Sequence, residues 1–176
     1  EAMSMNIFRL CGDLSHVVAI LILLYQIWKK RDARGVSLKT QECFLLVYVA
    51  RYLDLFTTYY SPYNSFMKIS YVLSAIWVVF MIRFPVDQLR YTYLSQEDSF
   101  PHWIWLVVPS SVVAVLVGLI GDGRTNLIEV LYSFSIILES VSIIPQLALM
   151  HYYRNWGTTM TSYVFFIWLY RFLYIL

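Results

Sequence analysis

Six long apolar segments constrain the fold of this chain more than any other feature. A transmembrane helix needs about 20 mostly apolar residues. The candidate segments run approximately over residues 6–28, 41–60, 66–83, 102–120, 126–150 and 159–176. Of all residues, 60% are hydrophobic and 14% are charged, whereas a soluble domain has about a quarter charged residues. The sequence therefore predicts an all-α polytopic membrane protein.

Composition and motifs exclude several classes of function. The net charge of +2 and the lack of a long lysine/arginine tract or a stacking module argue against binding of nucleic acid. Cys11 and Cys43 lie in apolar surroundings and are interpreted as packing residues, with no disulfide, metal site or cofactor expected. The sequence has no nucleophile elbow and no phosphate-binding glycine loop, so we expect a protein that is not an enzyme.

The loops between the apolar segments differ in charge, and this difference predicts the orientation. The second loop has no charge, and the fourth has one arginine and one aspartate. The positive charges of the first, third and fifth loops are Lys29, Lys30, Arg31 and Arg34, then Arg83 and Arg90, then Arg154. Positive loops face the cytoplasm. The N-terminus is therefore expected on the lumenal or outer side.

The two ends of the chain suggest how it relates to a natural protein. Met5 is interpreted as the natural start, and residues 1–4 as a remnant that precedes it. Residues 5–176 are expected to form a single transmembrane domain. Because Leu176 follows an aromatic run without a polar flank, we expect the natural parent to have at least one further helix.

Ionisable residues inside the apolar segments are the strongest indication of function. Such a charge costs about 2.5–3.5 kcal/mol at the centre of a helix that faces lipid. The charged residues of these segments are Arg9, Asp13, Arg51, Asp54, Glu129, Glu139 and Arg171, with His16 beside them. Arg9, Asp13 and His16 share one helical face, and Arg51 and Asp54 are neighbours on another. These groups are expected to meet in a shared interior or a water-filled cavity.

Three arginines on three helices predict a receptor for an anionic ligand. The guanidinium fork of Arg9, Arg51 and Arg171 suits carboxylates, and Glu129 suits a cationic end of the same ligand. Hydroxyls and ring faces for the ligand are available from Tyr52, Tyr132, Tyr170 and Tyr174. His16 lies one turn from Asp13 and is a candidate proton switch. Asp13 and Glu139 are candidates for a structural or tuning role.

Two other interpretations fit the same residues. Intramembrane carboxylates, His16 and the Pro145–Gln146 pair also suit a proton-coupled transporter of small solutes. In that pair the proline is expected to kink the helix, and the glutamine to satisfy the freed backbone groups. Alternatively, the charges form structural ion pairs that hold the helices together. The three arginines argue against a neutral sugar as a substrate, since a sugar would leave them unpaired.

Four blocks of the sequence resemble the KDEL receptor family, which returns escaped endoplasmic-reticulum (ER) proteins from the Golgi. They are "MNIFRLCGDLSH" at 5–16, "ARYLDLFTTYYSPYNSFMK" at 50–68, "IEVLYSFSIILESVSIIPQL" at 128–147 and "LYRFLYIL" at 169–176. The resemblance implies a seven-helix fold similar to sugar transporters built from two triple-helix bundles. It also implies that a lumen-facing cavity binds a C-terminal Lys/His-Asp-Glu-Leu tetrapeptide, and that coat machinery acts on the cytosolic side.

The resemblance further implies roles for individual residues. Arg51, with Tyr52 nearby, matches the residue that takes the terminal carboxylate, and Arg9 matches one that pairs with a ligand acid. Glu129 matches the partner of the basic first ligand residue, while His16 matches the pH sensor. Cavity residues are matched by Asp54, Tyr170, Arg171 and Tyr174, and Glu139 matches a carboxylate linked to Tyr170.

The sequence departs from the family pattern in two places. Tyr132 stands where the family usually has tryptophan, so the preference at the first ligand position is open. The chain also ends before the family's Asn-Trp and following arginine on helix six, and before helix seven. The resemblance therefore implies that one arginine for a ligand acid and the cytosolic tail are missing from this chain.

Overall fold

A computed structural model describes residues 7–53, 62–84, 89, 91–120, 126–152 and 157–175. All regular structure in these residues is helical, which confirms the predicted all-α class. The α-helices are α1 (Ile7–Leu24), α2 (Leu38–Arg51), α3 (Pro62–Arg83), α4 (Val108–Ile120), α5 (Leu127–Val141), α6 (Ile144–Tyr152) and α7 (Thr158–Ile175). Two π-helices, Tyr25–Lys29 and Trp103–Val107, continue α1 and precede α4.

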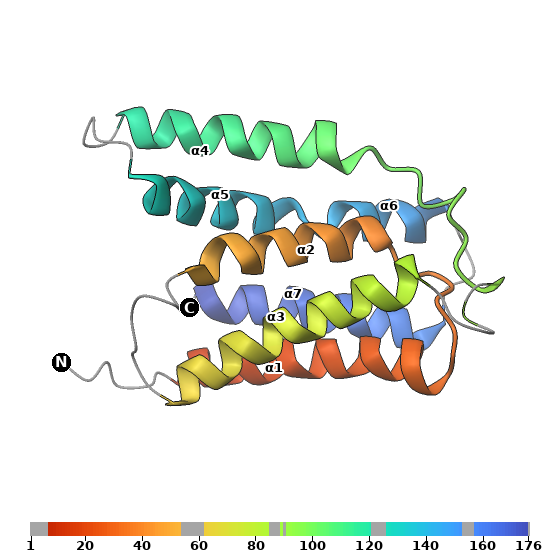
Figure 1. The fold of residues 1–176 in the computed structure, drawn as a ribbon. Helices are drawn as coiled ribbons and strands as arrows, with labels where there is room; N and C mark the ends of the chain where they lie inside the picture. Colours follow the sequence, from red (N-terminus) through yellow and green to blue (C-terminus); the bar gives the residue numbers. More distant parts are fainter. Residues whose placement is uncertain are drawn as a thin grey trace.

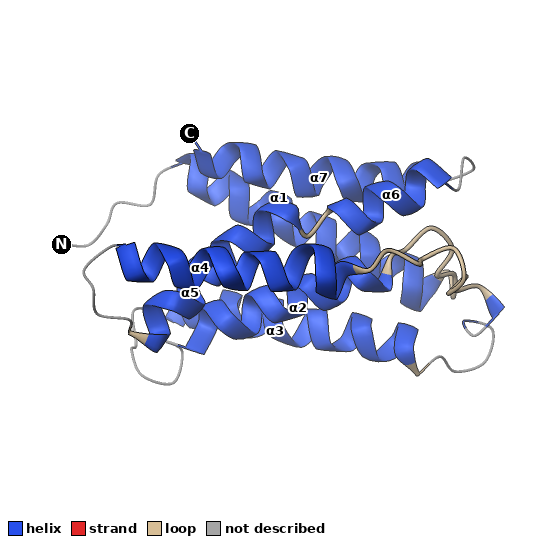
Figure 2. Cartoon of the chain, turned by 90° about the horizontal axis from the view of Figure 1, so that it is seen from above, coloured by secondary structure: helices blue, strands red, loops and turns tan. Residues whose placement is uncertain are grey.

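The helices form an elongated bundle in which neighbours along the chain run in opposite directions, except that α6 continues in the direction of α5 (Figure 1). α1 packs mainly on α7, α4 packs on α5, and α2 lies between α3 and α5. The view from above separates the α1–α7 pair from α2 and α3 (Figure 2). The start of α1 and the end of α7 lie at one end of the bundle, which we call the terminal end. The described parts of the first, third and fifth loops lie at the opposite end, which we call the loop end.

Four helical segments are long and apolar enough to cross a membrane: Ile7–Lys29, Pro62–Arg83, Trp103–Ile120 and Leu127–Tyr152. These are four of the six spans predicted from the sequence. The other two correspond to α2 and α7, which run alongside them in the bundle. α2 is described over 14 residues, and the rest of the predicted second span, from residue 54, lies outside the described residues.

Two helices begin earlier than the apolar runs predicted. α2 begins at Leu38 because the Ser37 side chain caps it, accepting a hydrogen bond from the Thr40 backbone N–H. α3 begins at Pro62, a residue whose fixed φ and missing N–H suit the first turn of a helix. The stretches "LKT" at 38–40 and "PYNS" at 62–65 precede the two predicted spans. Caps and first-turn residues extend both helices beyond their apolar segments.

The fifth apolar segment is one span divided in two, as its proline predicted. α5 ends at Val141 and α6 begins at Ile144, just before Pro145. Proline lacks the backbone N–H that would continue the helix. The backbone N–H of Gln146, in the first turn of α6, donates to Thr40 Oγ1 of α2 at 2.9 Å. The break therefore connects α6 to α2.

Candidate functional site

Glu139 is the centre of a buried cluster of charges formed by three helices. Its carboxylate, on α5, is paired with the guanidinium of Arg51 at the end of α2. Oε1 lies 3.4 Å from Nη2 of Arg171 on α7 and accepts a hydrogen bond from the Tyr170 hydroxyl at 2.9 Å. Glu139 is 6% exposed. Burial keeps solvent from screening these interactions, so the electrostatic attraction between the groups is strong.

Among the described residues, the cluster contains more positive than negative charge. In the described ion pairs, Arg51 and Arg171 share one carboxylate, that of Glu139. Arg51 uses its Nε to donate to Ser135 Oγ at 3.1 Å, whereas the buried Nη2 of Arg171 makes no hydrogen bond among the described residues. Two guanidinium groups with one carboxylate carry an excess charge of +1. An anion could take the unused donor and the excess charge together.

His16 lies in the same interior and is enclosed by tyrosines. Its ring stacks on Tyr170 at a centroid distance of 4.3 Å and on Tyr71 at 4.5 Å. Nε2 is 2.7 Å from the Tyr48 hydroxyl. Because Tyr170 also donates to Glu139, a continuous set of contacts joins the imidazole to the charged cluster. Tyr170 thus contacts both the His16 ring on α1 and the Glu139 carboxylate on α5.

Asp13 connects α1 to two other helices. Its carboxylate accepts hydrogen bonds from Tyr174 of α7 and, at 3.2 Å, from Tyr63 of α3. Gly12 permits the close packing, since a Cβ there would lie 3.2 Å from the Tyr174 ring. Asp13 is buried, whereas Arg9, one turn earlier, is exposed. The face shared by Arg9, Asp13 and His16 therefore runs from the exposed start of α1 into the interior.

The other predicted site residues lie outside the Glu139 cluster. Tyr52 caps the end of α2, half-buried, with its ring parallel to that of Tyr48. Glu129 and Tyr132 are exposed in the first turns of α5. The ends of α1, α2, α5 and α7 that carry the predicted residues all lie toward the terminal end (Figure 1). Asp54 lies outside the described residues.

Several residues of this interior were not among the predicted site residues. Tyr48 and Tyr71 contact His16, Tyr63 contacts Asp13, and Ser135 contacts Arg51. The chain has 15 tyrosines, so residue type alone does not distinguish these three. Sequence spacing could have indicated Tyr48 as a site residue, because it precedes Arg51 by one helical turn.

A second polar cluster at the loop end holds the helices together. Gln146, fully buried, accepts from the Ser37 backbone N–H at 2.9 Å and donates to the Gly35 carbonyl at 2.6 Å. The glutamine side chain was expected to satisfy its own helix, and it binds the first loop instead. Asp98 accepts from the Ser37 hydroxyl at 2.8 Å.

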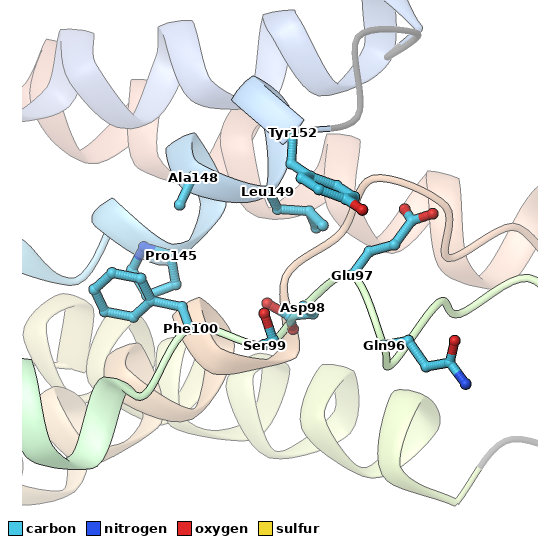
Figure 3. A pocket seen from close by; sticks show the side chains of 9 residues that line it. All are labelled: Gln96, Glu97, Asp98, Ser99, Phe100, Pro145, Ala148, Leu149 and Tyr152. Carbon is cyan, nitrogen blue, oxygen red and sulfur yellow. The ribbon is translucent and has the colours of Figure 1, made fainter.

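A pocket of about 270 Å³ lies beside this second cluster. It is bounded by the segment 96–100 and by α6, and Figure 3 shows the side chains that line it. None of the predicted ligand-binding residues is among them. Within the described part of the chain, no group of three or more His, Cys, Asp or Glu side chains could hold a metal ion. Both cysteines have free thiols.

The fold and the buried charges define a polytopic helical membrane protein with a cluster of charged side chains in its interior. The family described as "ER lumen protein retaining receptor" matches residues 32–176. The chain is 43% identical over 171 residues to ER lumen protein-retaining receptor 2 of Gallus gallus. It is 40% identical over 172 residues to receptor B of Arabidopsis thaliana. These matches cover 97% and 98% of this chain and 77% of each relative. The chain belongs to the ER lumen protein-retaining receptor family, which confirms the resemblance.

Proposed function

We propose that this protein is a pH-dependent sorting receptor. It binds C-terminal Lys/His-Asp-Glu-Leu signals of escaped ER proteins in the Golgi and returns those proteins to the ER. The observation that carries the proposal is the sharing of Glu139 by Arg51 and Arg171. A peptide that ends in two acidic side chains and a terminal carboxylate has the charge that this cluster lacks.

The proposed contacts follow the charges of the ligand. Arg51, with Tyr52 beside it, takes the terminal carboxylate through its planar fork. Arg9 and Arg171 pair with ligand acids, and Glu129 pairs with the basic first residue, which packs against Tyr132. Asp54, Tyr170 and Tyr174 complete the polar lining.

Proton binding and peptide binding are coupled in this proposal through Glu139. A ligand carboxylate at Arg51 competes with Glu139 for the same guanidinium. Protonation of Glu139 removes the competitor, and protonation of His16 adds a positive charge between two tyrosine faces, which favour a cation. Acid therefore favours the bound state, and the neutral ER favours release. Asp13 tunes the balance through Tyr174.

The proposed orientation places the terminal end in the lumen. The basic loops at the loop end then face the cytosol, in agreement with the positive-inside rule. The site would open to the compartment that contains the peptide signals. The protein would reside in Golgi and ER membranes.

Substitution of Arg51 tests the proposal. Arg51→Lys keeps the positive charge and loses the fork. We expect peptide affinity to fall about tenfold or more while the melting temperature changes little. Arg83→Lys is the matched control, because Arg83 pairs with Glu42 at the loop end. Unchanged peptide affinity in Arg51→Lys would contradict the assigned role.

The same variants separate the other interpretations. A structural role for the charges predicts that Arg51→Ala unfolds the protein, whereas a receptor predicts a folded protein that no longer binds peptide. A small-solute transporter predicts proton-driven uptake into proteoliposomes that the peptide does not affect. Amidating the peptide's C-terminus should abolish binding to the receptor, because it removes the carboxylate that Arg51 recognises.

A further inference from the structure

The loop end has an exposed basic patch, made of Lys29, Lys30 and Arg31, that the proposed peptide site does not use. Each of the three side chains is exposed. Trp28 and Tyr25, in the π-helix that leads into the patch, are 64% and 53% exposed. The first membrane-spanning segment ends at Lys29. Tryptophan, tyrosine and basic residues at this level are typical of the boundary between a membrane and water.

The backbone holds the patch in a defined shape. The π-helix gives way to a turn in which Arg31 has a φ of +52°, in the left-handed region. A residue other than glycine reaches this region at a cost of about 1–2 kcal/mol. The Lys30 backbone N–H donates to the Tyr25 carbonyl at 3.1 Å, and that of Asp32 donates to Gln26 at 3.2 Å. These bonds fix the reversal that presents three consecutive cations.

The nearby carboxylate of Asp32 does not neutralise the charge of the patch, because it pairs with Arg34. Asp32 binds the guanidinium of Arg34 through two hydrogen bonds, of 2.9 and 3.0 Å, and also accepts the Arg34 backbone N–H. Lys30 Nζ donates to the neutral Thr159 hydroxyl of α7 at 3.0 Å. Among the described residues, Lys29 and Arg31 have no ion-pair partner. The patch therefore keeps a charge of +3 at the end of a membrane span.

We propose that the patch formed by Lys29, Lys30 and Arg31 binds the headgroups of anionic phospholipids. A membrane occupant fits better than a soluble acidic protein, because the exposed rings of Trp28 and Tyr25 adjoin the charges and can insert beside the headgroup. The patch lies at a membrane boundary in either orientation of the chain, so this interaction is independent of the proposed peptide binding. Each basic residue near an anionic surface contributes about fivefold to the affinity.

Binding of short-chain lipids to the purified protein in neutral detergent tests this proposal. The probes are dioctanoyl phosphatidylserine, dioctanoyl phosphatidylcholine and the free headgroup glycerophosphoserine, measured by native mass spectrometry. We expect phosphatidylserine to bind in preference to phosphatidylcholine, with an affinity that falls as salt rises. The triple variant Lys29→Gln/Lys30→Gln/Arg31→Gln should lose about a hundredfold in affinity.

Control variants keep the result interpretable. Asp32→Asn/Arg34→Gln removes a neutral pair from the same turn, and it should leave lipid affinity unchanged. Lys29→Arg/Lys30→Arg/Arg31→Lys keeps the charge and should retain binding, whereas Trp28→Ala should weaken binding of the lipid more than of the free headgroup. Equal affinity for the two lipids, or full phosphatidylserine binding by the glutamine triple variant, would overturn the proposal. Competition by glycerophosphoserine at the same concentration as the lipid would instead indicate a soluble anion as the occupant.

Discussion

Replacing Glu139 with glutamine removes the negative charge that two arginines share while leaving the shape of the side chain unchanged. At 3.4 Å from Arg171, a unit charge interacts by ~5 kcal/mol at an effective dielectric constant of about 20. Breaking a buried pair costs about 3–5 kcal/mol. Arg51 and Arg171 side chains are 22% and 32% exposed, so water recovers part of this loss. We expect destabilisation of about 2–4 kcal/mol.

Thermal unfolding in detergent measures this loss. For a chain of this size, each 1 kcal/mol corresponds to about 2–4 °C, so the melting temperature of Glu139→Gln should fall by roughly 4–16 °C. A saturating acidic peptide should raise the melting temperature of the variant more than that of the wild type, because both arginines of the variant are free to bind it. Glu97→Gln, at the loop end, is the matched control. An unchanged melting temperature in Glu139→Gln would refute the shared-carboxylate account.

Three further substitutions test other parts of the structure. Gln146→Leu should cost about 2–4 kcal/mol, measured by thermal unfolding, because it leaves a buried donor and a partly buried acceptor of the first loop unpaired; a neutral result would contradict the stabilising role of the loop-end cluster. Burial raises the pKa of Asp32, but hydrogen bonds from Arg34 outweigh it and hold this pKa below its ordinary value. The Asp32–Arg34 pair therefore stabilises the fold above about pH 4. Wild type and Asp32→Asn should differ by less than about 1 kcal/mol in unfolding free energy, and this difference should vanish in stronger acid. Gly12→Ala should lower the melting temperature by displacing the Tyr174 ring, and full stability would show that the ring adapts without cost.

Local signals in the sequence predicted the helices better than the contacts between them. Apolar length identified four segments that can span a membrane, and Pro145 correctly predicted the break in the fifth segment. Arg51 and Asp54 are close in sequence, which favoured a local pair. Asp54 lies outside the described residues, and the described carboxylate partner of Arg51 is Glu139, 88 residues away. Which helices become neighbours depends on packing throughout the bundle, and no short stretch of sequence encodes it.

Titration of the purified protein with a peptide that ends in His-Asp-Glu-Leu tests whether the protein is a pH-dependent receptor for this signal. Isothermal calorimetry at acidic and at neutral pH measures its affinity, with the C-terminally amidated peptide as the control. We expect tighter binding at acidic pH and no binding of the amidated peptide. Equal affinity at both pH values, or undiminished binding after amidation, would contradict the proposed function.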